Sequence, residues 1–230
     1  GGGGAELIDG GDGADMLYGG DGDDSIQGGL GNDKLYGDDS GAGNADVIWG
    51  GSGSDAIYGG GGDDILGGGA GAESGGGPGV FGGDGDDKVY GGSGDFADWL
   101  QGDNGHDTIF GGDGADSIYG GDDQGEIWGG KGDDHLWGGG FGSTPTTSDG
   151  DADVFGFVAS SGADTIADFE DGKDLIDLSG YTGIAGFGDI GVAQDTVVAT
   201  STIVTLENGD QITLENTTAA NITAADFIFA

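Results

Sequence analysis

A nine-residue repeat rich in glycine and aspartate fills the first 137 residues of the chain. Its typical unit reads GGxGxDxUx, where U is aliphatic, as in GGDGADMLY (10–18) and GGDGADSIY (111–119). Fourteen units follow one another: eleven have nine residues, and the units 37–49, 68–81 and 91–101 are longer. A fixed period of this kind predicts a solenoid, in which each repeat is one structural unit that stacks on its neighbours.

The positions within each unit predict a tight turn followed by a very short strand. Glycines at positions 1, 2 and 4 suit a chain that turns sharply and adopts positive φ. A single aliphatic residue at position 8, between outward residues at 7 and 9, is the period-two pattern of a strand with one side buried. The position-8 residues are Ile8, Leu17, Ile26, Leu35, Ile48, Ile57, Leu66, Val80, Val89, Leu100, Ile109, Ile118, Ile127 and Leu136.

The charge of the chain excludes several classes of partner. With 44 Asp and Glu against 4 Lys and Arg, the formal net charge is −40, so nucleic acid and anionic lipid are repelled. No apolar run approaches the ~18 residues of a transmembrane segment, and no signal peptide opens the chain. The sequence has no cysteine, so stabilising metal sites must use oxygen ligands, which suit hard cations such as Ca²⁺. Since it starts within a repeat and without Met, we expect it to be part of a longer or processed chain.

The repeat resembles that of the RTX (repeats-in-toxin, hemolysin-type) family, whose GGxGxDxUx nonapeptide forms a Ca²⁺-binding parallel β-helix. The resemblance covers residues 1–137 almost without interruption. It implies an all-β fold, a right-handed parallel β-roll in which two successive units make one turn. Odd units then stack on one sheet and even units on the other. It also implies that multiple Ca²⁺ ions lie between stacked turns, held by the position-6 carboxylate and by carbonyls of the glycine-rich segment.

This resemblance makes the position-6 acids the predicted Ca²⁺ ligands. In the regular units they are Asp15, Asp24, Asp33, Asp55, Asp64, Asp87, Asp107, Asp116 and Asp134. In the first and the expanded units they are Glu6, Asp46, Glu73 and Asp98. Unit 120–128 departs from the pattern, with Gly125 at position 6 and Glu126 at position 7, so its turn is expected to bind poorly or to be built differently.

Elementary energetics predict that the roll needs its cations in order to fold. One buried aliphatic side chain per unit offsets little of the entropy lost in fixing nine residues. Carboxylates stacked at the strand spacing of about 4.8 Å would also repel one another. A disordered acidic linker would not hold an aliphatic residue two places after the acid in nearly every unit. Additional acids at positions 3 and 5 are interpreted as solvated turn residues: Asp12, Asp21, Asp23, Asp84, Asp86 and Asp113.

Position 9 is often aromatic, and its even-unit series would form an outward stripe. The series is Tyr18, Tyr36, Tyr58, Phe81, Gln101, Tyr119 and Trp137. Such a stripe could bind glycans or mediate lateral packing, but shielding of the strands by cross-strand pairing is the favoured interpretation. Catalysis has little support, because His106 and His135 fall in different units with no Ser or Cys nucleophile beside them. We therefore expect a protein that is not an enzyme.

The C-terminal region is expected to close the array. Residues 138–177 contain degenerate units (151–155, 162–166 and 172–176), and Phe155, Phe157, Ile166, Phe169, Leu175 and Ile176 are expected to enlarge the core. Residues 178–230 are expected to form a β-rich cap with a hairpin at Asn208-Gly209. The final segment NITAADFIFA resembles the C-terminal signal of RTX proteins exported by type I secretion.

These features together predict a secreted Ca²⁺-binding β-roll of a Gram-negative bacterium, extracellular or on the cell surface. Its expected partners are calcium ions and, transiently, the type I secretion machinery, with self-association or extracellular polysaccharide as further candidates. The expected role is structural: a surface or matrix component, or a secretion module that folds on Ca²⁺ outside the cell. The alternatives are an RTX tail module of a larger exoenzyme, such as a protease, lipase or polysaccharide-modifying enzyme, and a glycan-binding adhesin domain.

Overall fold

The computed structural model describes residues 1–38, 43–70, 79–94, 96–140 and 150–230. Within these ranges the chain is almost entirely β-strand, and helical structure is limited to three short 3₁₀ segments, η1 (Phe187–Asp189), η2 (Glu207–Gly209) and η3 (Ala224–Asp226). Across the described part of the chain, no helix has the length and apolar character required to cross a membrane. The predicted all-β class is confirmed.

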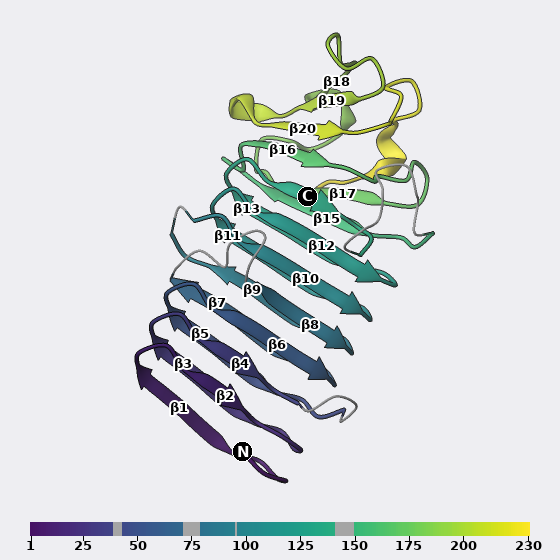
Figure 1. Cartoon of the computed structure of the whole chain (residues 1–230). Coiled ribbons are helices and arrows are strands. Elements are labelled where there is room, and N and C mark those ends of the chain that lie inside the picture. Colours follow the sequence, from purple (N-terminus) through teal and green to yellow (C-terminus); the bar gives the residue numbers. More distant parts are fainter. Residues whose placement is uncertain (39–42, 71–78, 95, 141–149) are drawn as a thin grey trace.

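The strands form a right-handed solenoid with two sheets that face each other (Figure 1). From β1 to β17 successive strands alternate between the sheets, so each of these strands pairs in parallel with the strand two places along the chain. The odd sheet contains β1 (Leu7–Asp12), β3 (Ser25–Leu30), β5 (Val47–Ser52), β7 (Ile65–Ala70), β9 (Lys88–Gly92), β11 (Thr108–Asp113), β13 (Glu126–Lys131), β15 (Val154–Val158), β17 (Leu175–Gly180) and β21 (Phe227–Ile228). The even sheet contains β2 (Met16–Tyr18), β4 (Lys34–Tyr36), β6 (Ala56–Gly61), β8 (Val80–Asp84), β10 (Trp99–Asn104), β12 (Ser117–Asp122), β14 (His135–Trp137), β16 (Ala163–Ile166), β20 (Gln211–Leu214), β19 (Thr202–Thr205) and β18 (Gly191–Gln194).

The register stacks the aliphatic position-8 residues directly on one another and fills the space between the sheets. Ile26 pairs with Ile48 on the odd sheet, and Leu35 pairs with Ile57 on the even sheet. From Ile26 to Leu136 these residues are at most 1% exposed, which confirms the predicted core. Ile8 and Leu17 are only partly buried, because they belong to the first turn and have a neighbour on one side alone.

Most strands of the repeat region extend beyond positions 7 to 9, because the glycine pair that opens the next unit also joins the ladder. Gly29 pairs with Gly11 and with Gly51, in register with the strands on either side. The turns stack so closely that a Cβ on Gly31, whose φ is +129°, would lie 1.9 Å from the carbonyl oxygen of Gly13. Glycine at position 4 is therefore required by both conformation and close approach.

Beyond Trp137 the parallel stacking continues through β15, β16 and β17. Phe155, Phe157, Ile166, Phe169 and Ile176 are buried as predicted. Leu175 was wrongly assigned to the core: it is only half-buried, because it stands at outward position 7 of its strand. The predicted hairpin is confirmed, since β19 and β20 pair antiparallel around Asn208 and Gly209, which both have positive φ.

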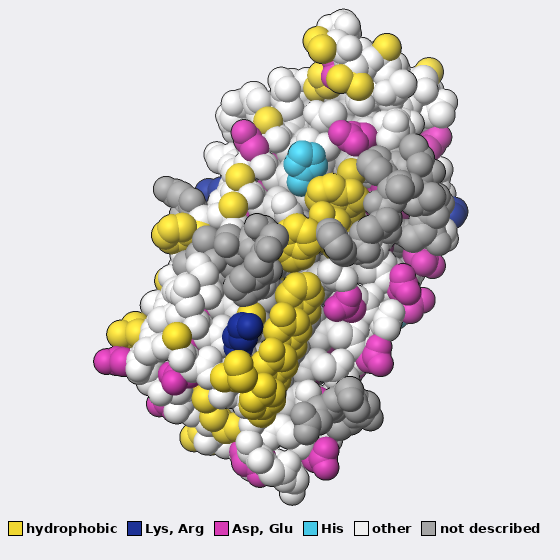
Figure 2. All heavy atoms as spheres, in the orientation of Figure 1, with side chains coloured by type: hydrophobic (Ala, Val, Ile, Leu, Met, Phe, Trp, Pro, Cys, Tyr) yellow, Lys and Arg dark blue, Asp and Glu magenta, His cyan; other side chains and the backbone are white. Residues whose placement is uncertain are grey.

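Four aromatic residues of the even sheet form a continuous stack on its outer surface. We call Tyr18, Tyr36, Tyr58 and Phe81 the tyrosine stack; its ring centroids are 4.7, 4.9 and 5.1 Å apart and its rings lie within 7° of parallel. Figure 2 shows it as a stripe of hydrophobic side chains along the solenoid axis. Because each ring covers the next, this geometry agrees with the favoured interpretation, cross-strand shielding.

Candidate metal centre

The position-6 acids form two columns, one along each edge where the glycine-rich turns stack. The odd carboxylate ladder contains Glu6, Asp24, Asp46, Asp64, Asp87, Asp107, Asp153 and Asp174, with Gly125 between Asp107 and Asp153. The even carboxylate ladder contains Asp15, Asp33, Asp55, Asp98, Asp116, Asp134 and Asp164. The structure therefore brings together, turn upon turn, the residues that the repeat predicts as ligands. Glu73 lies outside the described residues.

Each ladder is held by a repeated hydrogen bond from one turn to the next. The main-chain amide at position 6 donates to Oδ1 of the position-6 aspartate one turn further along the same sheet, as from Asp46 to Asp64 at 2.7 Å. Among the described residues, twelve such bonds have lengths from 2.7 to 3.1 Å. One carboxylate oxygen of each accepting aspartate is thus used in holding the solenoid together.

The second carboxylate oxygen, Oδ2, is buried and has no hydrogen-bond partner in most rungs. This holds for Asp15, Asp24, Asp33, Asp46, Asp55, Asp64, Asp87, Asp107, Asp116, Asp134 and Asp164. Such oxygens are rare in folded proteins, because leaving a buried acceptor unpaired costs about 1–3 kcal/mol, and more when it is charged. A column of them makes these oxygens candidates for binding a cation.

Burial has a clear electrostatic consequence for the ladders. It raises the pKa of Asp64, Asp107, Asp116 and Asp134 to about 7, mainly by desolvation, with neighbouring carboxylates adding to the rise. The pKa of Asp87 rises to about 8 for the same reasons. Without a cation, ionising these groups at neutral pH opposes folding.

Main-chain carbonyl oxygens lie close to the unpaired Oδ2 atoms, beside the glycine at position 1 of most units. A Cβ on Gly28 would lie 2.4 Å from Oδ2 of Asp33 and 2.6 Å from the carbonyl oxygen of Gly50. The same pair of neighbours surrounds the position-1 glycine in most units, for example Gly82, with 2.3 Å to Oδ2 of Asp87 and 2.4 Å to the carbonyl of Gly102. A side chain at position 1 would collide with the very oxygens that are candidates for a metal.

This oxygen set fits calcium. In the described part of the chain, no three Asp, Glu or His side chains converge on one point, so a metal here would take one or two carboxylates and complete its shell with main-chain carbonyls. Ca²⁺ accepts six to eight oxygen ligands of this mixed kind in flexible geometry, whereas zinc sites favour nitrogen and sulfur.

The turn at Gly125 lacks the position-6 carboxylate, as its sequence predicts. The Gly125 amide donates to Oδ1 of Asp153 at 2.7 Å, but position 6 has no carboxylate of its own. A Cβ on Gly120 would accordingly meet the carbonyl of Gly138 and the side chain of Ile127, with no carboxylate oxygen among its nearest neighbours. The odd ladder is therefore interrupted at this turn.

The structure adds three rungs that our list of predicted ligands omitted. Asp153, Asp164 and Asp174 are buried, and their Oδ1 atoms accept from the amides of Gly125, Asp134 and Asp153. Their signal was present in the acid-x-apolar step of the degenerate units. Asp174 differs, because its Oδ2 accepts from the amide of Glu170 at 2.7 Å.

Position 5 carries a second, weaker ladder that sequence reasoning also missed. Oδ1 of Asp23 accepts from the amide of Ala45, and Oδ1 of Asp86 accepts from the amide of His106. Both acids are exposed turn residues, and each in addition accepts a hydrogen bond that ties its turn to the next one.

Comparison with known protein families identifies the repeat region of the chain. The sequence profile of the RTX calcium-binding nonapeptide repeat matches residues 1–39, 40–72, 80–95, 93–125 and 126–143. No curated protein sequence matches the chain.

Three solved structures illustrate the similarity in fold. The AlgE6R2 subunit of the mannuronan C5-epimerase from Azotobacter vinelandii is 27% identical, with a TM-score of 0.41 over 58% of this chain and 88% of that one. The AlgE6R3 subunit of the same epimerase is 25% identical, with a TM-score of 0.32 over 63% and 78%. The extracellular lipase LipA from Serratia marcescens is 19% identical, with a TM-score of 0.44 over 99% of this chain and 38% of the lipase.

Proposed function

This chain belongs to the family of RTX calcium-binding nonapeptide repeat proteins, and from that premise we propose that it is a secreted β-roll that folds on Ca²⁺ outside the cell. Its role is structural, as a surface or matrix component or as the secretion module of a larger protein. The observation that carries the proposal is the column of buried, unpaired Oδ2 atoms along each edge of the solenoid.

The residues proposed to hold Ca²⁺ are the position-6 acids together with glycine-segment carbonyls. They comprise Glu6, Asp15, Asp24, Asp33, Asp46, Asp55, Asp64, Glu73, Asp87, Asp98, Asp107, Asp116 and Asp134, to which we add Asp153 and Asp164. Bound Ca²⁺ supplies the positive charge that lets adjacent carboxylates remain ionised side by side. Oδ1 keeps each turn in register through the amide, so Oδ2 can bind a cation without loosening the ladder.

Dependence on calcium suits a protein that crosses the envelope unfolded. Low cytosolic Ca²⁺ leaves the acidic turns to repel one another, and extracellular Ca²⁺ in the millimolar range suffices for low-affinity sites. The proposed route is type I secretion through the last residues. In the folded chain Phe227 and Ile228 form β21 against β17, and Thr223 and Asp226 form a capping box at η3, so folding would bury a signal that is accessible beforehand.

A calcium titration at pH 8 followed by far-UV circular dichroism tests the proposal. We expect little strand signal in excess EGTA and a cooperative rise with Ca²⁺, while equal concentrations of Mg²⁺ give a much smaller change. The same strand signal with and without EGTA would overturn the calcium-folding part. For the export part, the chain is expressed with a type I exporter, with and without residues 221–230, and export of both forms would contradict the proposed signal.

A further inference from the structure

The odd sheet has an apolar groove on its outer surface, on the side opposite to the tyrosine stack. We call Trp49, Tyr90, Phe110 and Trp128, from β5, β9, β11 and β13, the aromatic groove. A hollow of about 500 Å³ extends from Trp49 to Phe110, and a second of about 240 Å³ extends from Phe110 to Trp128. Both are lined by Phe110 and Gly112, so they form one channel along the solenoid axis.

Glycines that replace the expected aromatic residue create this groove. Position 9 is Gly67 on β7, and the Trp49 indole leans over it, 2.2 Å from where its Cβ would stand. Gly156 on β15 is covered in the same way by Trp128. The ring of Trp49 can therefore lie along the sheet, and Trp49 remains 42% exposed.

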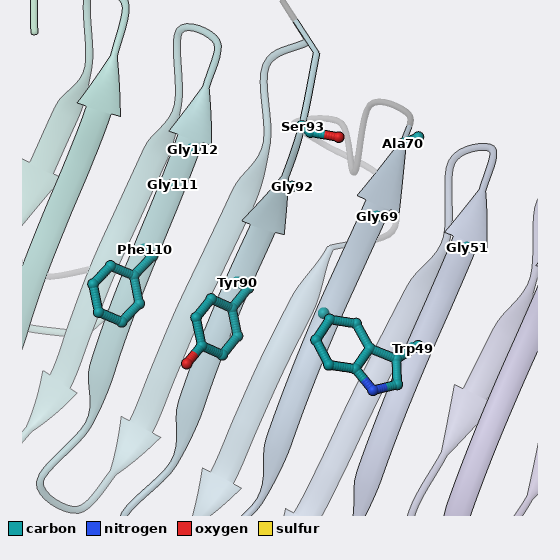
Figure 3. Close-up of a pocket in the computed structure, with 11 residues that line it drawn as sticks. Trp49, Gly51, Gly69, Ala70, Tyr90, Gly92, Ser93, Phe110, Gly111 and Gly112 are labelled. Carbon is teal, nitrogen blue, oxygen red and sulfur yellow. The ribbon is translucent and has the colours of Figure 1, made fainter.

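The rings of the aromatic groove are more widely spaced than those of the tyrosine stack at both ends, while the central pair, Tyr90 and Phe110, is stacked at 5.2 Å with planes at 9°. Trp49 and Tyr90 have centroids 6.4 Å apart with planes at 24°, and Phe110 and Trp128 are also 6.4 Å apart at 20°. Figure 3 shows the rings of Trp49, Tyr90 and Phe110 in a row that crosses the strands. In the tyrosine stack, by contrast, spacings of 4.7 to 5.1 Å leave the ring faces covered by one another.

The chemistry of the lining identifies the occupant. Among the residues that the structure describes, no charged side chain lines either hollow, although the chain as a whole carries a net charge of −40. Ca²⁺ on the position-6 acids reduces this charge but leaves an excess of carboxylates, which repels anionic polymers and opposes docking of a second copy of the chain. A neutral sugar chain offers apolar ring faces to stack on aromatic rings and hydroxyls to bond with polar groups, here the Tyr90 and Ser93 hydroxyls.

We propose that the aromatic groove binds a neutral polysaccharide chain laid along the solenoid axis. From β5 to β13 the groove crosses four strand spacings of about 4.8 Å, or roughly 19 Å, which is long enough for several sugar rings. The proposal is independent of export, and it assigns a binding role to the odd sheet, whereas the tyrosine stack of the even sheet is structural.

Calorimetry on the calcium-loaded chain tests the proposal with cellohexaose, mannohexaose and chitohexaose as neutral probes, and with a hexamer of uronic acid residues as the anionic comparison. Tryptophan fluorescence provides a second readout, because Trp49 and Trp128 belong to the groove. We expect at least one neutral hexamer to bind and the anionic hexamer not to bind.

Three variants then separate ring stacking from general hydrophobic contact. Trp49→Leu and Phe110→Leu keep apolar bulk and lose the ring face, so each should weaken binding about tenfold, the order expected for one aromatic contact. Tyr58→Leu makes the same kind of change in the tyrosine stack and should leave binding unchanged. Circular dichroism in Ca²⁺ verifies that each variant folds.

Several results would overturn the proposal. These are the absence of binding by every neutral hexamer at millimolar concentration, preference for the anionic hexamer, or an equal loss of binding in Tyr58→Leu and Trp49→Leu. Sedimentation of the free chain identifies the other occupant: a dimer that Trp49→Leu abolishes would assign the groove to a second copy instead.

Discussion

The main-chain amide of Asp64 donates a 2.7 Å hydrogen bond to Oδ1 of Asp87, which lies 23 residues later and one turn along the same sheet. Oδ2 of Asp87 is buried and without a hydrogen-bond partner. One side chain therefore performs two tasks: its first oxygen fixes the register of adjacent turns, and its second is left for a cation. Under the proposed function, the repetition of this arrangement would couple folding to calcium at each turn that has such an aspartate.

Replacing Asp87 by Asn should separate these two tasks. Asn retains an oxygen to accept from the Asp64 amide, but it removes the charge that attracts Ca²⁺. We expect the calcium midpoint for folding to rise by about tenfold, equivalent to about 1.4 kcal/mol. Asp171→Asn, an equal charge change at an exposed position, is the control and should leave the midpoint in place. Circular dichroism measures these midpoints. Equal midpoints for Asp87→Asn and the unaltered chain would contradict a ligand role for Asp87.

Low pH should partly replace calcium in stabilising the folded chain. The folded-state pKa is raised from 3.8 to about 7 for Asp64 and Asp116 and to about 8 for Asp87, so the folded chain binds more protons than the unfolded chain between these limits. The resulting stability is fully present below about pH 4, decreases as pH rises, and is lost once pH has passed the folded-state pKa values of about 7 to 8. In EGTA we therefore expect strand signal at pH 5 that disappears by pH 8. An unchanged spectrum across this range in EGTA would contradict the raised pKa values.

The regular part of the fold could be predicted from the sequence because each position of the nine-residue repeat has the same structural role in nearly every unit. An aliphatic residue every nine positions predicts a stacked core, and the alternation of units between the sheets follows from the family resemblance. Strand length was underestimated, because Gly29 and its equivalents were assigned to turns although their backbones pair with the next coil. Local glycine content indicates a turn, while stacking makes the same glycines part of a sheet.

The candidate site was predictable in its residue type but not in its extent. Asp153 and Asp164 lie in units of irregular length, so a fixed nine-residue frame does not align them with Asp134. Three-dimensional register restores the alignment, since Thr165 pairs with His135. The division of labour between Oδ1 and Oδ2 cannot be read from spacing either, because it depends on which amide lies one turn away.

Glycine at position 1 should be essential for calcium-dependent folding. A Cβ on Gly82 would lie 2.3 Å from Oδ2 of Asp87 and 2.4 Å from the Gly102 carbonyl, so Gly82→Ala forces both oxygens away. We expect a loss of about 1–3 kcal/mol in the unfolding free energy measured in Ca²⁺. Gly188→Ala, where nothing lies within 4 Å of the added carbon, is the matched control. Equal stability of the two variants would show that the position-1 space is not constrained.

The cap should depend on one buried hydroxyl. Tyr181 is fully buried, and its hydroxyl donates to Oδ2 of Asp210 at 2.9 Å, which links the end of the solenoid to the β19–β20 hairpin. Tyr181→Phe removes this bond and should destabilise the folded chain by about 1–3 kcal/mol. Hydrogen exchange should show the loss first in β19 and β20. Unchanged exchange there would mean that the link does not stabilise the cap.

Gly125→Asp should repair the interrupted ladder. The position is suitable, because a Cβ on Gly125 would have its nearest contact, Oδ1 of Asp153, at 3.4 Å, and the backbone is not in the left-handed region. The new carboxylate would stand one turn beyond Asp107 and offer an acceptor to the Asp107 amide, as Asp87 does for Asp64.

We expect the Gly125→Asp variant to bind additional Ca²⁺ by calorimetry and to unfold at a higher temperature in Ca²⁺, with no gain in EGTA, where the added charge is unpaired. Gly125→Asn supplies the same acceptor without the charge and should gain less. If Asp and Asn give equal stability in Ca²⁺, the gain comes from the hydrogen bond alone, and the carboxylates of this ladder do not bind the cation. A larger gain for Asp that depends on Ca²⁺ would instead identify position 6 as the ligand that each regular turn contributes.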